Sequence, residues 1–156
     1  MEDEITPIRK AESLTEAGGP VDECRATLAI YGDDLNPDVV SGMLGCSPSH
    51  AHRQGDRKSP TSPAFKTGAW LLTVETKSPN GPQEAISALL ARFPATSEFW
   101  QPIVAKFRVS VRVGIHTVGW NRGFGLSPEI LNAVGGIGAG IGFDLYFYGE
   151  ETDGGV

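Results

Sequence analysis

The chain has 156 residues, of which 40% are hydrophobic and 21% charged, a composition that suits one globular domain. It has no run of about 18 apolar residues, which excludes a membrane-spanning helix. The net charge of −6 lies at the two ends, because residues 1–23 carry seven acids and two bases and residues 149–156 carry three acids and no base. The body, residues 24–148, is mildly basic, with nine acids and eleven bases.

We therefore expect an acidic flexible tail over 1–23, a single domain over 24–148 and an acidic C-terminal tail over 149–156. The acidic start lacks the apolar stretch of a secretory signal, which predicts a cytoplasmic protein. Cys24 and Cys46 form no CxxC motif, so a zinc ribbon and a thioredoxin motif are excluded, and both thiols are expected to stay reduced.

Alternation of apolar and polar residues predicts four strands. They cover residues 24–31, 68–76, 107–116 and 141–148, and a short edge strand falls within 50–57. In the first strand the alternation directs Leu28 and Ile30 to one face and Arg25 and Tyr31 to the other. Trp70 lies on the apolar face of the second strand and is expected to anchor the core.

Capping residues mark the predicted helices. Asn36 and Pro37 begin a helix that Gly45 ends, and Ser127 and Pro128 begin another in the same way. A further helix is expected over 82–93, which carries an apolar stripe, and a short turn of helix over 97–104.

Strict alternation means that each strand is half-buried, whereas a parallel sheet covered on both faces shows continuous apolar runs. The sequence therefore predicts an α+β fold of ferredoxin-like kind. It has an antiparallel or mixed sheet of four to five strands, with two to three helices packed on one face.

Several short motifs, taken together, resemble a known family. They are Leu35-Asn36-Pro37, Leu44-Gly45-Cys46-Ser47-Pro48, Gly55-Asp56, Gly68-Ala69-Trp70, Gly123-Phe124, Leu126-Ser127-Pro128-Glu129 and Asp144-Leu145-Tyr146. Over residues 24–148 the chain is similar to the bacterial domain-of-unknown-function family 4279. The resemblance implies a small α+β domain. The family has no assigned reaction or agreed catalytic residues, so no functional residue is carried over.

The polar face of the sheet is the main candidate site, because Arg and Tyr are enriched at interfaces. Its predicted binding residues are Arg25, Tyr31, Arg108, Arg112, His116 and Tyr146, together with Arg53 and Arg57 from a basic loop. Arg108 and Arg112 are expected to form the electrostatic centre, with Lys106 and His116 in the same row. Two alternatives stay open: a basic binding face, or a solvated lattice that Glu75 or Asp144 neutralises.

Other motifs give weaker signals. His50, His52 and Asp56 resemble a metal set, but the neighbouring bases Arg53, Arg57 and Lys58 argue against a cation, so we expect no metal and no cofactor. The glycines of 135–142 follow a helix and precede a strand, the reverse of a phosphate loop, and are interpreted as a turn. No GxSxG motif or catalytic triad order is present.

Two functions from different classes remain. The first is a non-catalytic binding module whose partner is a protein, a second copy of the chain or an anionic small ligand. The alternative is a small enzyme acting on an anionic substrate, with His50, His52 and Asp56, or His116, beside Arg108 and Arg112. A body charge of only +2 argues against nucleic acid. Convergence of the histidines and arginines in one pocket would favour the enzyme.

Overall fold

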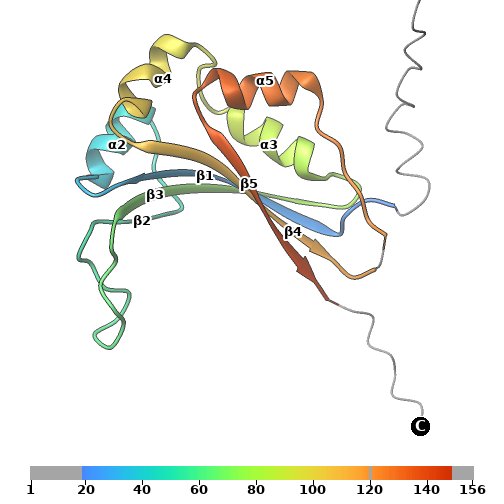
Figure 1. The fold of residues 1–156 in the computed structure, drawn as a ribbon, viewed down its shortest axis with the longest axis horizontal. Coiled ribbons are helices and arrows are strands. Elements are labelled where there is room, and N and C mark those ends of the chain that lie inside the picture. Colours follow the sequence, from blue (N-terminus) through green and yellow to red (C-terminus); the bar gives the residue numbers. More distant parts are fainter. Residues whose placement is uncertain (1–18, 120, 149–156) are drawn as a thin grey trace, which may run out of the picture.

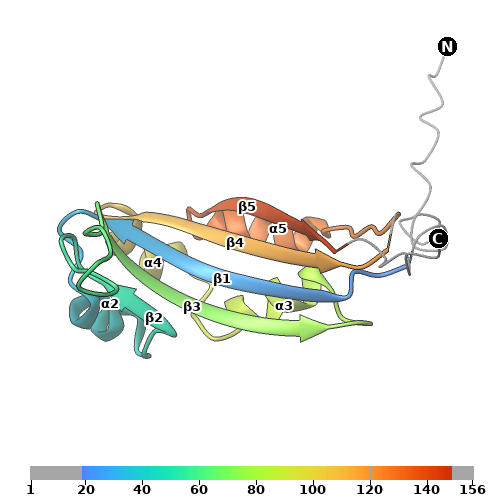
Figure 2. The same cartoon turned by 90° about the horizontal axis from the view of Figure 1, so that it is seen from below.

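The alternating segments form one sheet, which lies below the helices in Figure 1 and is seen with its strands side by side in Figure 2. The computed structural model describes residues 19–119 and 121–148. Its strands are β1 (Glu23–Gly32), β2 (His50–His52), β3 (Gly68–Lys77), β4 (Arg108–Thr117) and β5 (Gly140–Phe147), in the order β2-β3-β1-β4-β5. Only β4 and β5 pair in parallel. The sheet is therefore mixed, and the predicted α+β class is confirmed.

The crossovers explain why this sheet is mixed. β3 and β4 both run antiparallel to β1, so they are parallel to each other, and the chain passes over β1 between them. This arrangement is the split β-α-β unit of ferredoxin-like folds. A second crossover joins β4 to the adjacent parallel strand β5. Both crossovers contain helices, as parallel connections require.

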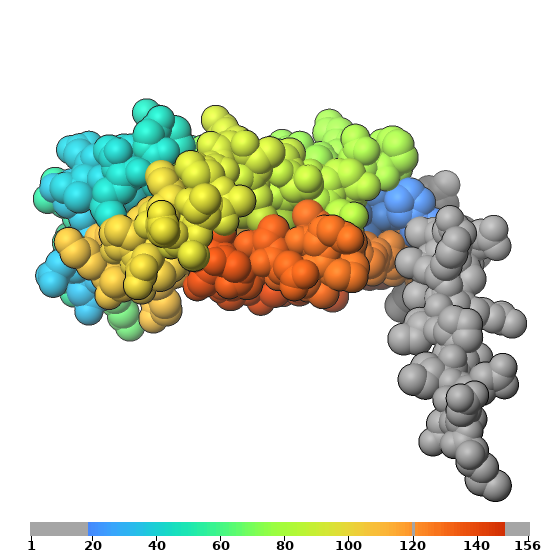
Figure 3. All heavy atoms as spheres, turned by 90° about the horizontal axis from the view of Figure 1, so that it is seen from above, coloured from blue at the N-terminus to red at the C-terminus, as the bar shows by residue number. Residues whose placement is uncertain are grey.

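Four helices are present among the described residues, one more than the upper limit that we expected. They are α2 (Pro37–Leu44), α3 (Pro82–Leu90), α4 (Ser97–Val104) and α5 (Pro128–Gly136). The Asn36 side chain accepts a hydrogen bond from the Asp38 amide, and Gly45 ends α2 in the left-handed region at φ 74°. All four helices lie on one side of the sheet (Figures 1 and 3).

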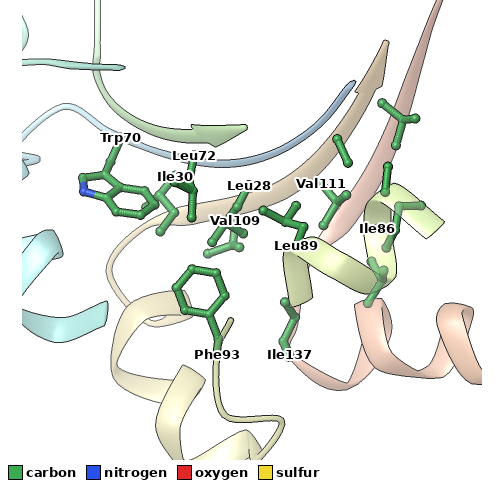
Figure 4. Packing of buried hydrophobic residues seen from close by; sticks show 14 of the residues in the cluster. Leu28, Ile30, Trp70, Leu72, Ile86, Leu89, Phe93, Val109, Val111 and Ile137 are labelled. Carbon is green, nitrogen blue, oxygen red and sulfur yellow. The ribbon is translucent and has the colours of Figure 1, made fainter. Parts of the chain in front are cut away.

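The core fills the space between the sheet and the helices (Figure 4). Leu28, Ile30 and Val111 point into it from the strands, and Ile86 and Leu89 point into it from α3. Trp70 is fully buried, as predicted, and its Nε1 donates a hydrogen bond to Ser41 Oγ at 3.0 Å. The bond satisfies the indole N–H inside the core.

Residues before position 24 already belong to the folded domain. From the sequence we expected the N-terminal tail to extend to residue 23. Val21 is 2% exposed and belongs to the core. The Asp22 carboxylate accepts a hydrogen bond from the Val118 amide at 2.8 Å, and the Asp22 amide donates to the His116 carbonyl. Residues 1–18 and 149–156, which hold the rest of the predicted tails, lie outside the described residues. In the described part of the chain, no helix has the length and apolarity to cross a bilayer.

Candidate functional site

None of the helices in the described residues lies on the other side of the sheet (Figure 2), and we call this side the open face. The register brings its side chains into rows across the strands. In one row Tyr31 lies beside Arg108, and in another Thr27 lies beside Arg112. His116 lies beside Tyr146 in a third. The predicted polar face thus exists as one continuous surface.

A shallow depression of about 370 Å³ lies on the open face. Its lining residues are Arg25, Thr27, Tyr31, Leu71, Arg112, Gly114, His116, Asp144 and Tyr146. Five of the eight residues predicted for the binding surface are among them. Arg108 lies at the end of the same face, with its guanidinium carbon 5.8 Å from the centre of the Tyr31 ring.

The arginines of the depression are held in ion pairs by Asp144 and Glu75 on neighbouring strands and by Glu23 on the same strand as Arg25. Arg112 Nη2 lies 3.0 Å from Asp144 Oδ2, and this hydrogen bond raises the pKa of the guanidinium. Arg25 Nε lies 3.1 Å from Glu75, and its Nη2 lies 3.7 Å from Glu23. Of the two arginines expected at the electrostatic centre, Arg112 is therefore paired with Asp144, whereas Arg108 lies over the ring of Tyr31.

Stacked rings form one end of the depression. His116 lies face to face with Tyr146, with ring centres 4.7 Å apart and planes 10° apart. Tyr148 stacks against the same imidazole, and its hydroxyl lies 3.2 Å from His116 Nδ1. Both tyrosines are about half-exposed. The stack therefore offers rigid aromatic surface with polar groups at its edge, a combination enriched at binding sites.

Gly114 contributes to the depression and was missed by the sequence reasoning. It sits between Arg25 on β1 and Asp144 on β5. A methyl group built there would meet nothing closer than Tyr146, at 3.9 Å, so no steric conflict requires glycine. Gly140 and Gly142, interpreted as part of a turn, belong to β5 and lie on the same face with open space around them. Glycine inside a strand is the available signal, because it often marks close approach of a ligand.

The histidines of β2 lie far from the depression. The register puts His50 six residues along the strands and three strands away from His116, or about 20 Å by about 14 Å. The ring of His52 stacks on Phe65 with centres 3.6 Å apart. Partial burial lowers the pKa of His52, and the neighbouring His50 lowers it further. The structure therefore does not bring His50 and His52 together with His116 in one pocket.

The basic loop between β2 and β3 extends from the sheet on its open side (Figure 1). Arg57 Nη1 donates to the Ser62 carbonyl at 2.6 Å, and the Asp56 carboxylate accepts from the Arg53 amide at 2.8 Å. Asp56 thus fixes a turn of the loop. Arg53 and Arg57 line no part of the depression.

No metal centre is formed by the described residues, since none of their His, Cys, Asp and Glu side chains gather in groups of three or more. Cys24 and Cys46 are free thiols. Burial raises the pKa of Cys24, which keeps the thiol protonated and a poor nucleophile. The chemistry available on the open face is thus hydrogen bonding, ring stacking and ion pairing.

Comparison with known proteins identifies the family of this chain. No curated protein and no solved structure matches it. The sequence profile of one family, described as a domain of unknown function (DUF4279), matches residues 22–148. The match begins next to the buried Val21 and ends one residue after β5, so it spans the whole sheet and its helices. The chain belongs to the DUF4279 family.

Proposed function

We propose that this domain is a binding module that holds a partner protein on its open face. The depression around Gly114 is the observation that supports the proposal. It combines a floor without a side chain, stacked rings at one end and paired charges along its walls. One side chain of the partner protein fits into the depression. The side chains of the open face around the depression contact the partner's backbone and its adjacent residues.

The shape of the site favours a protein over a small molecule. Pockets for small ligands bury most of the ligand's surface, whereas this depression is shallow and lies on the open face of the sheet. Arg25 and Arg112 already have carboxylate partners, so a small anion would have to compete with Glu75 or Asp144 for these positive charges. A protein surface can instead match the alternating charges at the rim.

The enzymatic alternative has less support. Convergence of His50 or His52 on His116 would favour it, and His50 and His116 lie at opposite corners of the open face. His116 does share the depression with Arg112, but without a second histidine. A cytoplasmic location belongs to the proposal as well and is consistent with the two free thiols.

Affinity capture with the full chain tests the proposed function. The bait is immobilised and exposed to an extract of the source cells, next to two variants. Gly114→Phe fills the depression, and Val39→Lys changes an exposed residue of α2 on the helix side. We expect a protein that is retained by the wild type and by Val39→Lys and lost with Gly114→Phe. Equal retention by all three baits, or retention by none, would contradict the proposal.

A further inference from the structure

The edge strand β5 lacks the features that normally protect a sheet edge. Natural edges are kept short or carry lysine, proline or a bulge, because an open strand invites pairing with another chain. The opposite edge, β2, is three residues long. β5 has eight residues and no lysine, arginine or proline, and its one charge, Asp144, is paired with Arg112.

The backbone of β5 offers hydrogen-bonding groups along this edge. The Tyr148 amide donates to the Thr117 carbonyl of the neighbouring chain segment. Alternate residues of a strand direct their N–H and C=O groups to opposite sides. Tyr146 and Asp144 therefore turn their backbone groups towards β4, whereas Phe143 and Leu145 turn theirs outward.

Apolar side chains accompany these outward groups. Phe143 and Leu145 face the helix layer by alternation, yet Phe143 is 39% and Leu145 73% exposed. Phe124, itself exposed, lies beside Phe143 with ring centres 5.4 Å apart. The end of β5 thus combines outward backbone groups with an uncovered apolar surface.

We propose that a second copy of this chain pairs with β5 in the antiparallel direction, with the two-fold axis at Leu145. In this register Leu145 faces Leu145 of the second copy, and Phe143 faces Phe147. A register shifted by one residue would place apolar side chains of one copy beside polar side chains of the other on the same face of the sheet. An axis at Asp144 would place two carboxylates opposite each other, which is unfavourable.

The size of the surface fits a dimer. At about 200 Å² for a full side chain, the exposed fractions of β5 and Phe124 amount to about 500 Å² per copy. Two copies that cover all of this surface would bury at most about 1,000 Å² of side chain, to which the paired backbone adds, and specific interfaces begin at about that size. The edge adds no net charge that would repel a second copy, because Asp144 is neutralised within its own sheet.

The dimer also extends the open face. With the axis at Leu145, Tyr146 of the second copy lies opposite Asp144, which forms a wall of the depression. The two depressions then adjoin across one continuous sheet. The inference rests on the β5 edge alone and holds whether or not the open face binds a partner protein.

Sedimentation analysis of the full chain between about 1 and 200 µM tests the pairing. We expect a wild-type species of twice 16.6 kDa. Leu145→Lys buries a charge at the axis and is expected to raise the dissociation constant about 100-fold or more. The matched control Val39→Lys alters an exposed apolar residue of α2 and should stay dimeric. A wild-type monomer over the whole range, or a dimer that Leu145→Lys leaves intact, would overturn the proposal.

Cysteine cross-linking tests the register. Opposed residues that exchange backbone hydrogen bonds have Cα atoms about 5.5 Å apart, within the range of a disulfide. Leu145→Cys should therefore form a covalent dimer under mild oxidation, whereas Phe143→Cys should not, because it faces residue 147. The wild type reports any background from Cys24 and Cys46. Cross-linking through Phe143→Cys and not through Leu145→Cys would refute the register.

Discussion

Replacement of Gly114 by phenylalanine should make the domain more stable, even though it abolishes the proposed binding. Gly114 lies in the middle of β4, where glycine is unfavourable because it loses the most backbone entropy and has no side chain to pack. A Cβ at this position would lie 3.9 Å from Tyr146 and 4.0 Å from the Arg25 carbonyl, both ordinary contacts. Nothing in the fold requires the glycine.

The expected gain in the free energy of unfolding comes from backbone entropy, strand preference and side-chain packing. Replacing glycine where the backbone is compatible stabilises by about 0.4–1 kcal/mol, and strand preference contributes over a range of about 1 kcal/mol. A ring packed beside Tyr146 adds about 0.2–1 kcal/mol. We therefore expect an increase of about 1 kcal/mol in the free energy of unfolding, or about 2–4 °C in Tm for a chain of this size.

Chemical denaturation and thermal melting measure the change, with Gly68→Ala as the control. At Gly68 an added Cβ would lie 2.8 Å from the Gly32 carbonyl oxygen and 3.0 Å from Leu35, so this variant should lose about 1–3 kcal/mol. A Gly114→Phe protein that loses more than about 1 kcal/mol would show that the hollow is not open. Gly114 would then be required by the fold, and its assignment to binding would be wrong.

Three further predictions concern the core, the ion pairs and the loop. Trp70→Ala should cost about 3–5 kcal/mol in denaturant unfolding, because the indole is fully buried, and a melt near that of the wild type would contradict the packing. A double-mutant cycle on Arg112 and Asp144 should give a coupling of less than about 1 kcal/mol that shrinks in high salt, since both side chains are about half-exposed. His52 should titrate by NMR below its ordinary pKa of 6.5, mainly because burial disfavours its charged form. Its contribution to stability is then present above pH 6.5 and lost as the pH falls; a pKa at or above 6.5 would contradict the partial burial of the imidazole.

The helices and strands could be predicted because their signals are local. Asn36 and Gly45 bound α2 through capping geometry that one turn of chain determines. The alternation in β1 and β4 likewise sorted core from open-face residues, and Trp70 was assigned correctly. Val21 lies in the segment that we expected to be a tail, yet it is buried in the core, because it precedes the alternation and is placed by contacts distant in sequence.

The candidate site depends on strand order, which no local pattern encodes. The pairing of Arg112 with Asp144 follows from the parallel contact of β4 with β5, 32 residues later in the chain. The same topology leaves β5 at an edge. Its apolar residues Phe143 and Leu145 have the pattern of a buried face, yet they are exposed because the described helices do not cover that end of the strand.

Amide chemical shifts recorded with and without the captured partner show which face of the domain binds it. We expect the changes to cluster around the depression, at Thr27, Arg112, Gly114 and Asp144, while α2 and α3 stay unchanged. In Gly114→Phe these changes should disappear although the spectrum remains that of a folded protein. Changes confined to the helix layer, or to the loop that carries Arg53 and Arg57, would contradict the assignment of binding to the open face.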